Sequence, residues 1–221
     1  MTCQCFLFDL DGTLVDTAPD LAAAVNRVRL VNHFEPMDPE SLIPYASKGA
    51  PGLLGKAFGI KPEDEHYPKL RQQFFDFYQA NCVDKSRVFD GIVELLETLR
   101  AQGIRCGVMT NKVERFAHEV LKGLGLHAYF DVIVGSDTEG SAMKPDPAGL
   151  LLAAHKLGID PSACCYAGDD YRDIVAAQRV PMPVALVAWG YCADSLQGSG
   201  ADYVAKTPQD LLAWVDALKR D

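Results

Sequence analysis

The sequence lacks several features that define large classes of proteins. Its apolar runs, such as 184–189, are far shorter than the roughly 20 residues of a membrane-spanning helix. The first ten residues contain no Lys or Arg, so we expect no signal peptide and a cytoplasmic protein. Basic charge is also scarce, since 21 Lys and Arg against 30 Asp and Glu give a net charge of −9. We therefore expect neither nucleic acid nor a membrane as a partner.

Metal-binding patterns built on cysteine and histidine are missing too. The seven cysteines include no CxxC pair, and the five histidines form no HxxxH or HxH pair. A chain of 24.1 kDa buries enough surface to fold without disulfides or a structural metal. Most cysteines fall in apolar, strand-like runs, so we interpret them as small buried residues of a protein in a reducing cytosol.

What the sequence does contain is an alternation of buried strands and amphipathic helices. Near-continuous apolar runs, typical of parallel strands covered on both faces, occupy 5–9, 105–110, 131–135, 163–168 and 183–189. Helical patterns separate them; in one, Ile92, Leu95, Leu96 and Leu99 share a face. The pattern predicts an α/β fold with a doubly wound, Rossmann-like parallel sheet.

One segment interrupts this alternation. Residues 16–86 contain three helical patterns, at about 19–31, 50–58 and 66–82, and no strong strand. We therefore expect a core domain of residues 1–15 and 87–221, with an all-helical domain of residues 16–86 inserted after the first strand. Ligands of such sheets bind at the carboxyl ends of the strands, where this insert begins, so we expect it to act as a lid.

Polar residues follow the predicted strands at those carboxyl ends. Asp9 and Asp11 end the first strand, and two such close carboxylates need a shared cation or proton. The other candidates are Thr110, Asn111, Lys144, Asp169, Asp170 and Asp173. Acidic groups around one point favour a hard cation such as Mg²⁺, while the hydroxyl, the ammonium and helix N-termini suit a phosphate.

These residues also carry a resemblance. Residues 9–13 (DLDGT), 110–111 (TN), 144–147 (KPDP) and 168–173 (GDDYRD) resemble the motifs of the haloacid dehalogenase-like hydrolase superfamily, and the insert resembles its type-1 cap. Residues 16–21 (DTAPDL) resemble the phosphoglycolate phosphatase branch. The stretches 110–117, 89–91, 168–174 and 189–191 are similar to the N-acetylmuramic acid 6-phosphate phosphatases within that branch.

The resemblance implies a phosphatase with specific roles for these residues. Asp9 would be the nucleophile that forms an aspartyl phosphate, and Asp11 the general acid and base. The Asp9 carboxylate, the Asp11 backbone carbonyl and the Asp169 carboxylate would hold Mg²⁺. Thr110, Asn111 and Lys144 would bind the phosphoryl group. Supporting positions are expected at Asp170 and Asp173, and Lys48 of the insert is a candidate contact for the substrate.

The expected partner is therefore a small phosphate monoester, with 2-phosphoglycolate and N-acetylmuramic acid 6-phosphate as candidates and the oligomeric state open. One departure from the superfamily pattern is Val180-Pro181, where an Ala-Gly pair is usual. A phosphomutase of the β-phosphoglucomutase type, which would share every core motif, stays an alternative. So does a non-catalytic phospho-acceptor or binding relative. A dehalogenase has no need of the acid at Asp11.

Overall fold

The computed structural model describes residues 3–192 and 198–218. Contacts divide the chain into two compact units, which we call the core unit (1–15 and 88–221) and the inserted unit (16–87). Where the chain crosses between them, β2 (Val15–Asp16) and β3 (Arg87–Val88) pair as a two-stranded sheet. Among the described residues, no helix has the length and apolar character needed to cross a membrane.

The core unit is built on a six-stranded sheet in the order β5-β4-β1-β6-β7-β8, and every pair of neighbouring strands is parallel. The strands are β1 (Cys5–Phe8), β4 (Arg105–Met109), β5 (Val132–Val134), β6 (Cys164–Gly168), β7 (Val184–Val187) and β8 (Tyr203–Ala205). The predicted doubly wound parallel sheet is confirmed. The sequence missed β8, because this edge strand is only partly buried and lacks a continuous apolar run.

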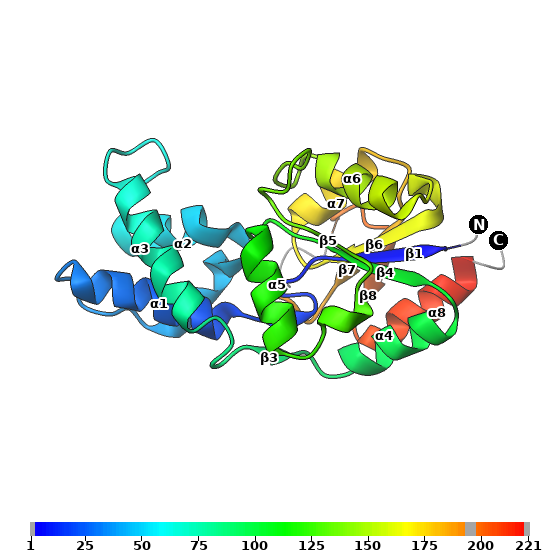
Figure 1. Cartoon of the computed structure of the whole chain (residues 1–221), viewed down its shortest axis with the longest axis horizontal. Coiled ribbons are helices and arrows are strands. Elements are labelled where there is room, and N and C mark those ends of the chain that lie inside the picture. The colour runs from blue at the N-terminus through cyan, green and yellow to red at the C-terminus, as the bar shows by residue number, and fades with distance from the viewer. Residues whose placement is uncertain (1–2, 193–197, 219–221) are drawn as a thin grey trace. The chain divides into compact units, whose positions relative to one another are not determined.

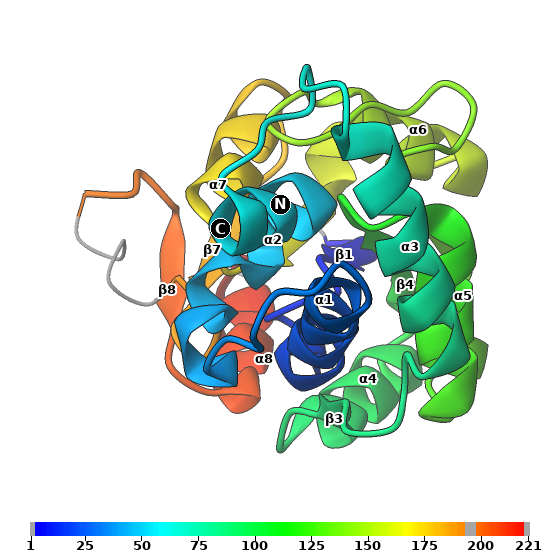
Figure 2. The same cartoon turned by 90° about the vertical axis from the view of Figure 1, so that its left-hand side faces the viewer.

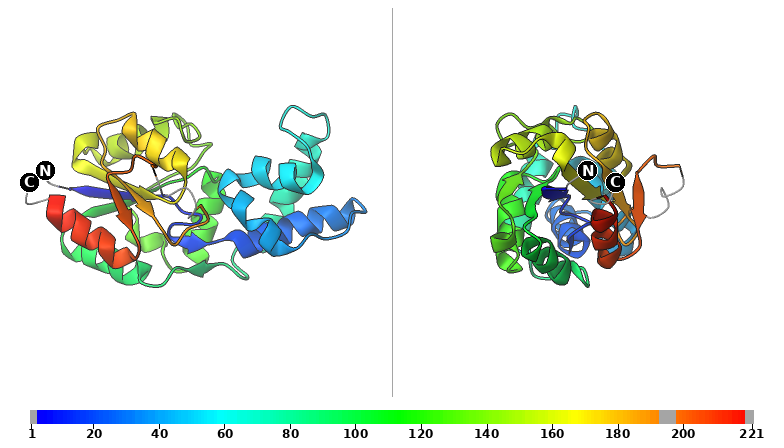
Figure 3. Two further views of the ribbon diagram at one scale, coloured as in Figure 1. Left: turned by 180° about the vertical axis from the view of Figure 1, so that it is seen from behind. Right: turned by 90° about the vertical axis from the view of Figure 1, so that its right-hand side faces the viewer.

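Helices cover both faces of this sheet (Figures 1 and 3). On one side lie α4 (Ile92–Ala101), α5 (Glu114–Gly123) and α8 (Pro208–Leu218), and on the other α6 (Ala148–Leu157) and α7 (Tyr171–Gln178). Short 3-10 helices, η3 (His127–Tyr129) and η4 (Pro161–Ala163), precede β5 and β6. In α4, the apolar residues that predicted the helix are all buried, as their spacing requires.

The two helix layers explain why β1 is apolar at every position. Phe6 stacks on Phe8 with ring centres 4.5 Å apart and meets the edge of Trp214 of α8. Cys5 and Leu7 point to the opposite face and belong to the core beneath α6 and α7. Because all four residues of β1 are fully buried, this strand lies at the centre of the molecule's main hydrophobic core. The cysteines on β1, β4 and β6 are buried as well, as predicted.

The inserted unit is helical. It contains α1 (Ala18–Val31), η1 (Pro39–Ser41), η2 (Ile43–Lys48), α2 (Gly49–Phe58) and α3 (Tyr67–Ala80). Figure 2 shows α1, α2 and α3 side by side, and each packs against the other two. Buried apolar residues of α1, such as Val25 and Val28, together with Phe74 and Tyr78 of α3, form a small core of its own. The short helices η1 and η2 were not predicted, because three to six residues give too little periodicity.

A buried carboxylate joins the two ends of this unit. Asp20, in the first turn of α1, accepts hydrogen bonds from the backbone N–H groups of Lys85 and Ser86, at 3.0 and 2.8 Å. The Ser86 hydroxyl donates to the same carboxylate at 2.7 Å. Asp20 is only 3% exposed, so its burial is compensated by donors from the returning chain.

Candidate active site

The topology brings three strand ends together at one edge of the sheet. β1 lies between β4 and β6, with Phe8 in register with Val108 and Ala167. The residues that follow these strands therefore share one edge: Asp9 and Asp11 after β1, Thr110 after β4, and Asp169 after β6. This is the edge at which ligands bind in sheets of this kind.

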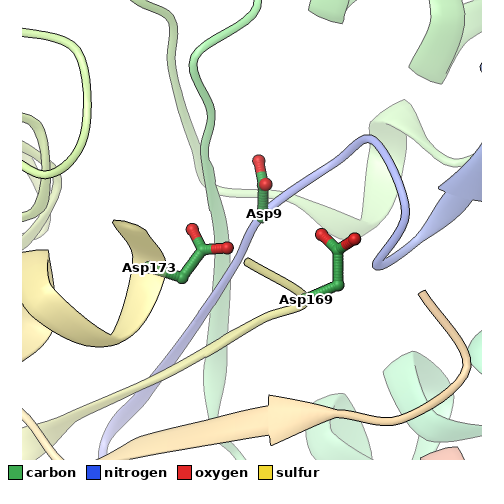
Figure 4. Close-up of side chains that lie close together, drawn as sticks. All are labelled: Asp9, Asp169 and Asp173. Atoms are coloured by element: carbon green, nitrogen blue, oxygen red, sulfur yellow. The ribbon is translucent and has the colours of Figure 1, made fainter. Parts of the chain in front are cut away.

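Three carboxylates meet there. Asp9, Asp169 and Asp173 each offer an oxygen atom such that these atoms all lie within 4.8 Å of one another. Figure 4 shows that they come from three segments: the loop after β1, the loop after β6 and the first turn of α7. All three are buried, with at most 6% exposure. Close buried carboxylates repel each other, so the group calls for positive charge.

Lys144 supplies part of that charge. Its ammonium lies 2.9 Å from Asp9 Oδ1 and 2.6 Å from Asp173 Oδ1, and it donates to the Tyr166 hydroxyl at 2.8 Å. Burial alone lowers the pKa of Lys144, but the carboxylates of Asp173 and Asp9 raise it by more. The side chain is therefore held as a cation against the predicted nucleophile.

Asn111 and Tyr166 hold this arrangement from behind. The Asn111 side chain accepts from the Lys144 backbone N–H at 2.6 Å and donates to the Lys144 carbonyl at 3.1 Å. Tyr166, on β6, donates to Asp173 Oδ1 or to the Met109 carbonyl, at 2.8 and 3.0 Å. The predicted contact of Asn111 with the phosphate stays a prediction. Tyr166 was not predicted as a site residue, because it lies within an apolar run typical of a buried strand.

The remaining negative charge fits a cation. Burial raises the pKa of Asp9 to about 6, although Lys144 opposes the rise. Burial, Asp173 and Asp9 raise the pKa of Asp169 well above its usual range. Among residues 3–192 and 198–218, no Lys or Arg forms an ion pair with Asp169. Oxygen ligands with uncompensated charge are the donor set that Mg²⁺ prefers, so these residues fit such an ion.

Glycines make room for Asp169. Gly12 has a φ of +83°, and a Cβ on it would overlap the Asp169 carboxylate. A Cβ on Gly190 would also overlap Asp169, from the loop after β7. In that loop, the Tyr191 N–H donates to Asp169 Oδ2 at 2.8 Å and the Trp189 indole to the Thr13 carbonyl at 2.9 Å. The loop therefore fixes Asp169 by close packing and one short hydrogen bond.

Asp11 has a different partner. Its two carboxylate oxygens lie 3.0 and 3.1 Å from the Lys112 ammonium, and both side chains are largely buried. The sequence did not single out Lys112 as a site residue. Its position directly after Thr110 and Asn111, at a strand end, was the available signal. Thr110 itself is 1% exposed, and its hydroxyl accepts from the Lys112 N–H at 3.2 Å.

Of the two other predicted residues, Asp170 borders the carboxylate cluster, where its backbone N–H donates to Asp173 Oδ2 at 3.0 Å, and Lys48 lies in the inserted unit. Asp170 is the N-cap of α7 and pairs with Arg172 at 2.8 Å. Burial raises the pKa of Asp170, but the bonds from Arg172 outweigh it and bring this pKa down to about 2. Lys48, at the end of η2, lies 5.3 Å from the ring centre of Tyr45. Its contact with a substrate remains a prediction.

The departure at Val180 and Pro181 falls in the turn between α7 and β7. Val180 donates to the Ala177 carbonyl at 3.1 Å, and Met182 donates to the Val180 carbonyl at 2.7 Å. The turn leads into β7 at Val184. The unusual residues thus replace the Ala-Gly pair without interrupting the strand that follows.

Known proteins are similar to this chain in sequence and architecture. The profile of the haloacid dehalogenase-like hydrolase family matches residues 6–187. The chain belongs to the haloacid dehalogenase-like hydrolase family. An N-acetylmuramic acid 6-phosphate phosphatase of Pseudomonas aeruginosa is 38% identical over 218 residues, which cover 98% of this chain and 96% of that protein. A phosphoglycolate phosphatase of Caulobacter vibrioides is 35% identical, covering 89% of this chain and 84% of that protein.

A solved structure agrees. The crystal structure of a predicted phosphoglycolate phosphatase from Haemophilus somnus superposes with a TM-score of 0.86 at 26% identity, covering 96% of this chain and 97% of that one. Membership of the haloacid dehalogenase-like hydrolase family, expected from the motifs, is confirmed. The predicted enzyme class, a phosphoric monoester hydrolase, is confirmed at that level by relatives named phosphatases.

Proposed function

We propose that this chain is a Mg²⁺-dependent phosphatase that hydrolyses a small phosphate monoester through an aspartyl phosphate on Asp9. The observation that carries the proposal is the position of Asp9: it lies at the centre of the strand ends, within 2.9 Å of Lys144 and grouped with Asp169 and Asp173. A buried carboxylate with a cation beside it can accept an anionic phosphoryl group, which an isolated carboxylate would repel.

The residues divide the reaction between them. Asp9 attacks phosphorus, and the bond from phosphorus to the ester oxygen breaks while Asp11 gives that oxygen a proton. Water then attacks the phosphoaspartyl group, Asp11 takes the proton from water, and the bond to Asp9 breaks. Lys144 stabilises the charge on the phosphoryl oxygens in both steps, and the Thr110 hydroxyl binds one of them.

Asp9 and Asp169, with the backbone carbonyl of Asp11, would hold the metal ion. Bound Mg²⁺ supplies charge neutralisation, so that the carboxylate of Asp9 and the phosphate can approach each other. Asp173 belongs to the same carboxylate group, but its short contact with Lys144 favours a role in holding that lysine. We assign Asp173 to the orientation of Lys144 rather than to the metal.

The substrate is a small molecule in this proposal, because the inserted helical unit resembles a type-1 cap and we expect such a domain to act as a lid. The two named relatives act on N-acetylmuramic acid 6-phosphate and phosphoglycolate, according to their names. Both of these molecules carry a carboxylate as well as a phosphate. Lys48 is the candidate in the inserted unit for binding that carboxylate, and the greater coverage of the first relative favours the sugar acid.

A substrate screen tests the proposal. Phosphate release would be measured from 2-phosphoglycolate, N-acetylmuramic acid 6-phosphate, common sugar phosphates and p-nitrophenyl phosphate, with Mg²⁺ and with EDTA. We expect Mg²⁺-dependent release from all active substrates and the highest kcat/KM with one of the two acids. Transfer of phosphate within β-glucose 1-phosphate, without release, would favour the phosphomutase instead. Activity that persists in EDTA would contradict the proposed role of the metal.

A further inference from the structure

The core unit contains a second buried lysine at the same edge of the sheet, and the proposed mechanism does not use it. Lys112 and Asp11 lie 101 positions apart in the sequence, yet the Lys112 ammonium contacts both oxygens of the Asp11 carboxylate, at 3.0 and 3.1 Å. The side chain of Lys112 is 5% exposed and that of Asp11 is 13% exposed. Both charged groups are largely removed from water. Loss of either partner would therefore leave the other as an uncompensated buried charge.

The backbone on both sides keeps this pair in register. The Lys112 N–H donates to the Thr110 hydroxyl at 3.2 Å, and the Lys112 carbonyl accepts from the Ser136 N–H at 2.9 Å. On the other side, Asp11 forms a bridge with Val15, and the Gly12 N–H donates to the Val15 carbonyl at 2.9 Å. Both side chains therefore extend from anchored loops, and their contact fixes the direction of the Asp11 carboxylate.

The two buried lysines contact aspartates of the same sheet edge. Lys144 faces Asp9 and Asp173, whereas the ion pair of Lys112 is with Asp11. We propose that Lys112 is a positioning residue that holds the Asp11 carboxylate in place for its two proton transfers. This inference rests on the proposed function. In it, the proton passes from Asp11 to the ester oxygen and later from water to Asp11, and Lys112 takes no part in either transfer.

Lys112 could instead bind the phosphoryl group directly, and this role predicts a different result. The ammonium would have to leave Asp11, and removal of Lys112 would then weaken substrate binding whether or not Asp11 is present. A residue that acts only through Asp11 loses its importance once Asp11 can no longer transfer protons. A double-mutant cycle separates the two roles, since residues that act as a unit are non-additive.

The experiment measures p-nitrophenyl phosphate hydrolysis in Mg²⁺ for five proteins beside the wild type: Lys112→Met, Lys112→Arg, Asp11→Asn, the Asp11→Asn/Lys112→Met double variant and Lys156→Met. Lys156 is an exposed lysine of α6 and serves as the matched control. We expect Lys112→Met to lower kcat at least about tenfold, part of the roughly 10²–10⁴-fold that general acid–base catalysis supplies. KM should change less than about threefold, since binding is untouched.

Two comparisons decide the outcome. In the Asp11→Asn background, Lys112→Met should cost less than about twofold, and Lys112→Arg should recover most of the wild-type kcat because its charge remains. An equal loss with and without Asp11 would overturn the inference, as would wild-type kcat in Lys112→Met. If Lys112→Met does not fold, Lys112→Arg still tests the idea: a folded Lys112→Arg as inactive as Asp11→Asn would overturn it. A wild type without Mg²⁺-dependent activity would instead overturn the proposed function.

Discussion

Two buried aspartates, one in each unit, differ in how many hydrogen-bond donors the protein supplies to them. In the inserted unit, Asp20 receives the Lys85 N–H, the Ser86 N–H and the Ser86 hydroxyl, and joins the start of α1 to the returning chain. In the core unit, Asp169 is equally buried but receives one short hydrogen bond, from the Tyr191 N–H at 2.8 Å, and a long one of 3.4 Å from Thr13. Burial and neighbouring carboxylates raise the pKa of Asp169 well above its usual range.

The difference separates a structural carboxylate from one reserved for a ligand. Donors of the protein itself compensate the burial of Asp20, so its charge stabilises the fold. Asp9 and Asp173 share the Lys144 ammonium, whereas Asp169 beside them has fewer donors, and its burial costs stability unless a cation binds. In the core unit, the Asp169 carboxylate at the strand ends therefore has few donors, whereas the Asp20 carboxylate of the inserted unit has its donors in place. Each prediction below tests one side of this contrast.

The largest effect is expected at Asp9. Asp9→Asn should lower turnover at least about 10³-fold, because an amide is a very poor nucleophile and removal of covalent nucleophiles costs this much or more. The fold should survive, since the substitution removes one charge from a crowded carboxylate group. Steady-state hydrolysis of p-nitrophenyl phosphate and a thermal unfolding curve measure both results. Activity near the wild-type level in saturating Mg²⁺ would rule out Asp9 as the nucleophile.

Metal affinity is the next test, and it compares Asp169 with Asp11. Asp169→Asn should raise the Kd for Mg²⁺ at least about tenfold, since even indirect partners of a metal are worth 10–100-fold. Asp11→Asn should leave this Kd within about twofold, because only its backbone carbonyl is assigned to the metal. Calorimetric titration with Mg²⁺ measures both. The reverse result, with Asp11→Asn weakening the metal and Asp169→Asn neutral, would exchange the two assignments.

The inserted unit should respond in stability instead. Asp20→Ala removes the acceptor of the buried Ser86 N–H and of the part-buried Lys85 N–H, and we expect a loss of about 2–4 kcal/mol in the free energy of unfolding. Asp76→Ala, at an exposed position of α3, is the control and should change this free energy by less than about 0.5 kcal/mol. Urea titration monitored by circular dichroism measures both. A variant at position 20 as stable as the control would show that the hydrogen bonds of Asp20 contribute little.

The sequence predicted the sheet, and it predicted which site residues share one edge wherever those residues directly follow a strand. Asp9, Thr110 and Asp169 each directly follow a strand, so parallel topology brings them to one edge, and Lys144 reaches them from the loop between β5 and α6. The strand β8 was missed because an edge strand that is only partly buried need not be apolar throughout.

Contacts that depend on side-chain reach were not predictable in the same way. The pairing of Lys112 with Asp11 depends on which way two loop residues point, and no spacing rule encodes that direction. The hydrogen bonds of the Asn111 amide with the Lys144 backbone were not foreseen either, because the two residues lie in different loops. Asp20 was seen only as part of a family-like stretch. Its role became visible once the chain was shown to return beside it at Lys85 and Ser86.

The smallest effect is a pH dependence of stability in the absence of metal. The pKa of Asp9 is about 6 in the folded protein against an ordinary value of 3.8, so the folded state binds more protons between these values. The free energy of unfolding should therefore fall as the pH rises through this window, and Asp169, whose pKa is also raised, extends the fall to higher pH. Bound Mg²⁺ favours the ionised carboxylates and should remove most of this fall. Melting curves in EDTA and in Mg²⁺, between about pH 4 and pH 8, should thus diverge by a few degrees as the pH rises. Asp9→Asn should show a flatter profile in EDTA, and a profile as steep as that of the wild type would contradict the assignment of the raised pKa to Asp9.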